Sequence, residues 1–196
     1  MIAFVRHGQT ELNRSGRLQG RLDVPLSDLG RRQARALGRG FASEPVRRVF
    51  SSPLRRAYET AAAIAGAHDL AVEVDDRLVE LDYGEWDGLP LGDVPVTDWQ
   101  AWRADPEFAP PGGERLVDVT ARVAAFCAEV GDPGLVIAVS HVSPIKAAVC
   151  KALQVDERVT FRMQLDVAAV TRVGSRPDGG SYLSTFNDTS FLKSVE

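Results

Sequence analysis

The 196-residue sequence predicts an α/β fold in which helices cover both faces of a mainly parallel sheet, giving a three-layer α/β/α sandwich. Two features lead to this class. Short apolar runs, typical of buried strands, alternate along the chain with longer segments whose apolar residues recur at helical spacing. Several of the apolar runs end in histidine, arginine or glutamate, and in open α/β sheets ligands collect outside the carboxyl ends of the strands.

The first apolar run, from Ile2 to Val5, is followed directly by Arg6, His7 and Gly8. A histidine and an arginine therefore stand where a short buried strand stops, which is a position suited to chemistry. The glycine lets the backbone turn tightly and approach a ligand closely. Taken alone, the tripeptide is as consistent with a chance loop sequence as with a site.

The stretch from residue 9 to residue 26 is rich in arginine, amide side chains and glycine and poor in periodic apolar residues. It is therefore predicted to be a loop. Arginine forks and backbone amides hold phosphate without a metal, and Gln19 and Gly20 of this loop are predicted to contact phosphate or substrate. A helix should follow from Ser27 to Ala42, where apolar residues recur near helical spacing.

A second apolar run, at residues 49–50, precedes the next predicted helix. Ser52 as N-cap and Pro53 at the first helical position indicate where this helix begins, and it should continue to Ala67. The dipole and free amides of a helix N-terminus favour an anion, so one of the two arginines of the first turn can point toward the site of His7. For an arginine pair alone, a solvated surface is the more common interpretation.

Two further apolar runs end in candidate catalytic residues. One strand-like stretch ends at Glu80, and a run from Leu135 to Val139 leads through a serine into His141. A helix is predicted from Ser143 to Leu153, with its proline tolerated in the first turn. Because the carboxyl ends of parallel strands meet at one edge of a sheet, these residues should join His7 there.

The remaining elements complete the alternation of strands and helices. A helix is predicted from Glu114 to Val130, and strands from Ala168 to Val173 and from Tyr182 to Phe186 flank Gly174–Ser181, whose Pro-Asp-Gly-Gly sequence predicts a hairpin turn. No internal repeat or linker is evident. Residues 1–196 are therefore expected to form a single domain.

Residues 85–113 break this alternation, with three tryptophans, several prolines and many acids against a single base, Arg103. Such an insertion is either a lid over the site or a structural crossover whose tryptophans fill a satellite core. As a lid, the segment favours a ligand whose covered part is apolar or neutral, because it offers acids and aromatics instead of bases.

Together these motifs resemble the histidine phosphatase superfamily in its phosphoglycerate-mutase-like branch, over nearly the whole chain from Phe4 to about Phe191. In that family the histidine after the first arginine becomes phosphorylated, which the resemblance assigns to His7 with Arg6 on the phosphoryl oxygens. The family's second phosphate-binding arginine stands immediately before alanine, and this position is Arg56. The family's asparagine six residues after the nucleophile also contacts phosphate, and Asn13 occupies this position.

The resemblance further implies Glu80 as the proton donor, because it stands three residues before the Tyr-Gly pair, and His141 as the second histidine of the phosphate pocket. Asp82 and Glu85 are rivals for the acid role, although solvated loop carboxylates are the more common interpretation. The family most often has glycine after the second histidine, and this chain has Val142. Its side chain either narrows the pocket or shifts the way in which the backbone amide meets phosphate.

The chemistry can also be built from residue types. A phosphomonoester dianion repels nucleophiles, so its charge must be neutralised, and Arg6, Arg56 and a protonated His141 would do this without a metal. Neutral His7 attacks. We expect a metal-independent phosphomonoester hydrolase with a phosphohistidine intermediate, acting on a sugar phosphate or an ester like α-ribazole phosphate, because the short chain is similar to α-ribazole phosphatases. The alternatives are a phosphoglycerate mutase and a non-catalytic, phosphate-binding scaffold.

Composition sets limits on partners. The formal net charge of -4 argues against nucleic acid or anionic membrane, and the apolar runs are too short to span a bilayer. No targeting segment is expected before the first strand. Cys127 and Cys150 lack metal or redox spacing and His68 is interpreted as surface filler, so no metal or cofactor is expected. Free thiols fit the cytoplasm. The expected partner is a small-molecule substrate, with a homodimer as a further expectation.

Overall fold

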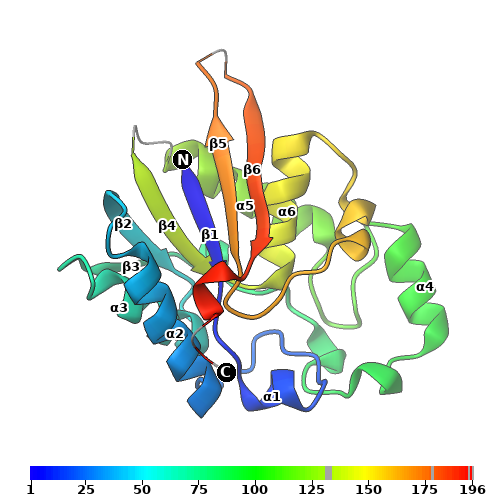
Figure 1. Ribbon diagram of the computed structural model, residues 1–196. Helices are drawn as coiled ribbons and strands as arrows, with labels where there is room; N and C mark the ends of the chain where they lie inside the picture. Colours follow the sequence, from blue (N-terminus) through cyan, green and yellow to red (C-terminus); the bar gives the residue numbers. More distant parts are fainter. Residues whose placement is uncertain (131–133, 178, 194, 196) are drawn as a thin grey trace.

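The computed structural model describes residues 1–130, 134–177, 179–193 and 195. Its centre is a six-stranded sheet in the order β3-β2-β4-β1-β5-β6 (Figure 1). The strands are β1 (Ile2–Arg6), β2 (Val46–Ser51), β3 (Val72–Val74), β4 (Leu135–Ser140), β5 (Val170–Ser175) and β6 (Ser181–Asp188). The first four in sequence pair in parallel, while β5 and β6 are antiparallel to their neighbours. The predicted, mainly parallel sheet is confirmed.

Helices pack on both faces of the sheet, as the side chains of β1 require. Ala3 and Val5 point to one face, where they join the buried core of α2 and α3, and Phe4 points to the other, where it packs with α5 and α6 (Figure 1). The helices are α1 (Glu11–Arg14), α2 (Asp28–Phe41), α3 (Arg55–Ala65), α4 (Val96–Ala104), α5 (Leu116–Glu129) and α6 (Val142–Leu153). The three-layer α/β/α arrangement is therefore confirmed, and the single-domain organisation stays a prediction.

The helix that follows the first loop has the predicted origin. Ser27 is its N-cap and accepts a hydrogen bond from the Gly30 N–H at 3.1 Å, and Ala34, Leu37 and Phe41 lie buried at helical spacing. The other long helices agree with the predicted ranges to within about two residues, apart from the start of α3. The small differences fall at the helix ends, where the sequence signals are weaker than along the apolar faces.

The predicted start of the arginine-bearing helix was wrong. α3 begins at Arg55 with Leu54 as its N-cap, and Pro53 lies in the preceding turn. Ser52 is fully buried, and its hydroxyl lies 2.8 Å from Nε2 of His141 instead of capping the helix. A serine followed by a proline is typical of a helix start, but the hydroxyl of Ser52 instead contacts His141, 89 positions further along the chain.

The prediction that a strand ends at Glu80 was also wrong. β3 ends at Val74, a 3-10 turn covers Asp76–Leu78, and Glu80 follows in irregular backbone. The segment is attached to the sheet by a side chain, because the Ser140 hydroxyl donates to the Leu78 carbonyl at 2.6 Å. This bond brings Glu80 to the carboxyl end of β4. Glu80 therefore lies at the predicted edge of the sheet, although no strand ends at it.

The predicted hairpin is formed by β5 and β6, and Asp178 of its turn lies outside the described residues. The segment 85–113 contains α4 and a cluster of aromatic side chains. Trp102 packs 5.9 Å from Trp86 and 5.3 Å from Trp99, measured between ring centroids. Trp86 and Trp102 are buried in the same core as Phe4. The segment is thus a packed cover beside the sheet (Figure 1), and its movement as a lid stays a prediction.

Candidate active site

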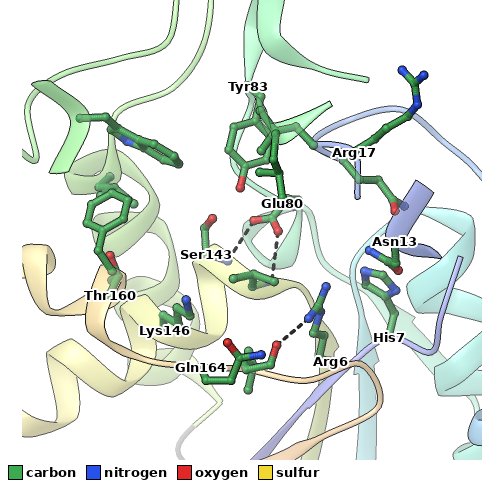
Figure 2. Close-up of a pocket in the computed structure, with 18 of the residues that line it drawn as sticks. Arg6, His7, Asn13, Arg17, Glu80, Tyr83, Ser143, Lys146, Thr160 and Gln164 are labelled. Carbon is green, nitrogen blue, oxygen red and sulfur yellow. Dashed lines mark hydrogen bonds between the residues drawn. The ribbon is translucent and has the colours of Figure 1, made fainter. Parts of the chain in front are cut away.

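A cavity of about 360 Å³ opens at the carboxyl end of the parallel strands, where Arg6, His7 and Glu80 line it together. Figure 2 shows His7 and Asn13 on one side, Lys146 and Thr160 on the other, and Glu80 between them. The end of β1, the loop that carries Asn13, the segment of Glu80 and the helix that carries Lys146 therefore meet here, at the carboxyl edge of the parallel strands.

His7 is held in one orientation by both ring nitrogens. Nδ1 lies 2.7 Å from the Gly8 carbonyl oxygen, to which it can only donate, and Nε2 lies 3.3 Å from Nε of Arg56, from which it can only accept. This pattern fixes the neutral tautomer with the proton on Nδ1. Burial, and then the positive charges of Arg56 and Arg6, hold the pKa of His7 well below its ordinary value.

The backbone after His7 is locked by a close approach of two elements. A Cβ atom on Gly8 would lie 2.6 Å from the Gly30 carbonyl oxygen of α2, so only glycine fits. The Gly8 N–H donates to the Thr60 hydroxyl at 3.1 Å, and this hydroxyl donates to the Arg56 carbonyl at 2.8 Å. The histidine and the first turn of α3 are therefore coupled.

Arg56 is fully buried beside His7. Its Nη1 donates to the Leu22 carbonyl and its Nη2 to the Gly20 carbonyl, each at 2.7 Å. Burial lowers the pKa of Arg56 to about 10, partly opposed by Glu80, so the guanidinium is still charged at neutral pH. Two backbone carbonyls and one imidazole nitrogen offset the cost of burying this charge.

Arg6 and His141 each present an unsatisfied nitrogen beside His7. Nη1 of Arg6 donates to the Leu165 carbonyl at 2.6 Å, while its buried Nε has no hydrogen-bond partner among the described residues. His141 is fully buried with its ring centroid 5.0 Å from that of His7, and its Nδ1 is likewise without a partner in the described part of the chain. Buried polar atoms without partners mark a site for a polar ligand.

The positive charge that a protonated His141 would add is opposed by its surroundings in the free protein. Burial, followed by the charge of Arg56 and the neighbouring His7, holds the pKa of His141 well below its ordinary value. The two arginines therefore carry the positive charge of the site, and His141 can offer a neutral N–H donor.

Glu80 is held by three backbone N–H groups, two of which lie at the start of α6. Its Oε1 accepts from Leu81 at 2.8 Å and Ser143 at 3.1 Å, and its Oε2 accepts from Val142 at 3.0 Å. The backbone N–H of Val142 is thus engaged by Glu80, and the valine side chain lines the cavity. The valine side chain is therefore part of the cavity wall and its amide is directed at the carboxyl group, while a narrowing of the pocket by this side chain stays a prediction.

The two rival carboxylates do not reach the cavity. Asp82 accepts from the Gly84 N–H at 2.9 Å and lies near Arg21, and Glu85 is exposed to solvent. Neither lines the pocket, whereas Glu80 does. The geometry therefore favours Glu80 over both.

The predicted phosphate-contacting loop residues divide into two groups. Asn13 and Gln19 line the cavity, and Oδ1 of Asn13 accepts from Thr10, which leaves the Asn13 NH₂ group as a donor for a ligand. Gly20 does not line the cavity, because its N–H donates to Asp87 and its carbonyl accepts from Arg56. The prediction of a substrate contact at Gly20 is therefore replaced by a contact with the arginine.

The histidine phosphatase superfamily (branch 1) matches this chain over residues 2–189 of its 196. The chain belongs to the histidine phosphatase superfamily. This confirms the predicted family and agrees with the observed fold.

Two curated relatives and one solved structure describe the neighbourhood within the superfamily. A bifunctional protein of Mycobacterium tuberculosis is 39% identical over 198 residues, covering 97% of this chain and 54% of that protein. Phosphoserine phosphatase 1 of Hydrogenobacter thermophilus is 39% identical over 164 residues, covering 79% of this chain and 77% of the relative. The structure of mycobacterial glucosyl-3-phosphoglycerate phosphatase superposes with a TM-score of 0.84 at 32% identity, covering 96% of this chain and 98% of that one. The chain spans about half the length of the first of these relatives.

Sequence reasoning missed the residues that support the superfamily motifs. Thr60 could have been found, because it lies one helical turn after Arg56 on the same face of α3. Ser52 and Lys146 give no such signal, since their contacts depend on how distant elements pack. Among the described residues, no cluster of three or more histidine, cysteine, aspartate or glutamate side chains could hold a metal ion, and no helix is long and apolar enough to cross a membrane.

Asp87 supports Arg56 through the loop between them. Its carboxylate accepts from the N–H groups of Gly20 at 2.7 Å, Arg21 at 2.8 Å and Leu22 at 3.0 Å. Two of these three residues present their carbonyl oxygens to Arg56. Asp87 therefore fixes the acceptors that orient the guanidinium.

We expect Asp87→Asn to raise KM for p-nitrophenyl phosphate by about tenfold, the scale of one charged hydrogen bond, because the amide cannot accept from all three N–H groups. The inhibition constant for inorganic phosphate should rise with it. Asp93→Asn, at an exposed acid of the same segment, is the matched control and should change neither value. Unchanged kinetics in Asp87→Asn would show that the loop holds Arg56 without this carboxylate.

Proposed function

We propose that this protein hydrolyses small-molecule phosphomonoesters through a phosphohistidine on His7. The observation that carries the proposal is the arrangement around His7 Nε2. This nitrogen holds a lone pair, two arginines flank it, and the carboxyl group of Glu80 lines the same cavity. A nucleophile, positive charge and a proton donor are the parts that phosphoryl transfer needs.

In the first step, Nε2 of His7 attacks phosphorus, and the bond from phosphorus to the ester oxygen breaks. The phosphoryl group takes the place of the hydrogen bond between Arg56 and His7, whose length of 3.3 Å makes it weak and easy to exchange. The unsatisfied nitrogens of Arg6 and His141 supply further donors to the phosphoryl oxygens. Glu80 gives its proton to the departing oxygen, so that the alcohol leaves neutral.

In the second step, a water molecule attacks the phosphohistidine. Glu80, now a carboxylate, removes a proton from this water, the bond from phosphorus to nitrogen breaks, and inorganic phosphate leaves. His7 and Glu80 return to their starting states. The hydrogen bond from His7 Nδ1 to the Gly8 carbonyl persists throughout and stabilises the positive charge that develops on the ring.

The substrate proposal is a small organic phosphate, with sugar phosphates and esters like α-ribazole phosphate as the first candidates. Relatives named as phosphoserine and glucosyl-3-phosphoglycerate phosphatases support hydrolysis rather than mutase chemistry. Residues 85–113 alone predict an apolar or neutral leaving group, because they contain a single base. The cavity also receives Arg17 and Lys146 from outside that segment, so an acidic leaving group fits as well.

The purified protein should release inorganic phosphate from members of a phosphomonoester panel, including p-nitrophenyl phosphate and 3-phosphoglycerate. Turnover should be unchanged by a chelator, because two arginines supply the charge that a divalent metal supplies elsewhere. Activity that is lost in the chelator and restored by magnesium or zinc would contradict the metal-free scheme. Conversion of 3-phosphoglycerate to 2-phosphoglycerate without phosphate release would identify a mutase.

A further inference from the structure

The cavity extends well beyond the phosphate-binding end. Lys146 and Thr160 lie on the opposite side of the cavity from His7 (Figure 2). Gln164 and Trp99 of α4 also line the cavity. A phosphoryl group on His7 places the departing oxygen toward Glu80, so the rest of the substrate must occupy this far side. We call this region, lined by Lys146, Thr160, Gln164 and Trp99, the leaving-group subsite.

Lys146 is positioned by the same helix turn that holds Glu80. It lies three residues after Ser143 and four after Val142 in α6, and the backbone N–H groups of those two residues donate to the Glu80 carboxyl. Residues three and four apart share a helix face. The lysine therefore lines the same cavity as the proton donor, and Figure 2 shows Ser143 between the two side chains.

The ammonium group of Lys146 lacks a partner in the free protein. It makes no hydrogen bond or ion pair with any residue that the structure describes, although most of the arginines in the described ranges do. Burial lowers the pKa of Lys146, and the negative charge of Glu80 opposes this effect. A partly buried cation that makes no hydrogen bond or ion pair is costly, so a bound molecule that brings an anion within hydrogen-bond distance of it gains affinity.

The charge balance selects a carboxylate over the other choices. A neutral leaving group would displace water from the ammonium without replacing its hydrogen bonds. A second phosphate would bring about two negative charges to the Lys146 side of the cavity, where one lysine balances them. The other cation, Arg17, lies on the side of Asn13 and donates to the Gly88 carbonyl at 2.8 Å (Figure 2). A single carboxylate matches a single ammonium.

We propose that Lys146 binds a carboxylate on the leaving group and selects phosphomonoesters of small hydroxy acids. The acceptor oxygen of Gln164 adds a place for a hydroxyl or amino group of the same acid, because the amide nitrogen is engaged by Asp166 at 2.9 Å. The inference rests on the proposed phosphatase activity and assigns its substrate class.

The test compares two esters that differ only in the carboxylate, 3-phosphoglycerate and racemic glycerol phosphate. The wild-type enzyme should prefer 3-phosphoglycerate in kcat/KM by about tenfold or more, the scale of one charged hydrogen bond. Lys146→Gln should remove most of this preference, mainly through KM, and Lys146→Arg should retain part of it. Lys151→Gln, at an exposed lysine of the same helix, is the matched control and should keep the preference.

Three results would overturn the inference. The first is a wild-type enzyme that hydrolyses p-nitrophenyl phosphate but treats the two esters alike. The second is a preference that survives in Lys146→Gln, and the third is an equal loss on both esters, which would assign Lys146 to the support of Glu80. A wild-type enzyme that hydrolyses none of the three compounds would overturn the proposed function, and this inference with it.

Discussion

Replacement of His7 by alanine should lower kcat on p-nitrophenyl phosphate by on the order of 10⁴-fold or more, the scale on which enzymes lose activity when their nucleophile is removed. The second histidine is a poor substitute, because His141 is fully buried, its ring centroid lies 5.0 Å from that of His7, and it is not among the residues that line the cavity. Stopped assays at high enzyme concentration should measure the residual rate.

A matched histidine variant provides the control for this loss. His68 lies beyond the end of α3, outside the cavity, and His68→Ala should retain wild-type turnover. If His7→Ala keeps more than a few per cent of wild-type activity while folding normally, a residue other than His7 is the nucleophile.

Glu80→Gln should lower kcat by on the order of a hundredfold or more on substrates with poor leaving groups, the usual scale of general acid catalysis. The amide keeps the size of the side chain but cannot give a proton to the departing alkoxide. On p-nitrophenyl phosphate the loss should be much smaller, because this leaving group departs without the proton. The measurement is kcat on an alkyl phosphate and on the aryl phosphate for the same enzyme preparation.

Variants of two neighbouring carboxylates serve as controls for this prediction. Asp82→Asn and Glu85→Gln alter carboxylates that lie outside the cavity, and both should keep most of the wild-type kcat. An equal loss on both substrate types in Glu80→Gln would indicate a role in folding or phosphate positioning. An active Glu80→Gln enzyme beside an inactive Asp82→Asn enzyme would transfer the acid role to Asp82.

The sequence predicted best those features that depend on strand order. Arg6, His7 and His141 follow buried runs of four or more apolar residues, and the parallel pairing of β1 with β4 brings these runs side by side. Helix faces such as that of α2 were also readable, because their apolar residues recur at a regular spacing.

Features that depend on one long-range contact were not predictable. Glu80 reaches the site because Ser140 holds the preceding turn, and a serine hydroxyl leaves no pattern in the sequence. Ser52 was predicted to cap α3, but its hydroxyl lies 2.8 Å from Nε2 of His141. The lowered pKa of His141 follows from complete burial beside two arginines, which only the packed structure reveals.

The leaving-group end of the cavity was also hidden from the sequence. Residues 85–113 were considered alone, and their acids and aromatics favoured a neutral substrate. Lys146 stands on α6, more than thirty residues beyond that segment, and enters the same cavity only because α6 packs next to the Glu80 turn. The substrate preference predicted from residues 85–113 therefore left out the cation that α6 contributes.

The most direct test of the account is to trap the phosphorylated enzyme. Brief incubation of the wild-type protein with ³²P-labelled substrate, followed by denaturation, should leave label that is lost in acid and retained in base, as phosphate on a histidine nitrogen is. Peptide mapping should place it on His7, and the label should be absent from His7→Ala. Label that survives acid treatment, or that persists in His7→Ala, would contradict a phosphohistidine at this residue.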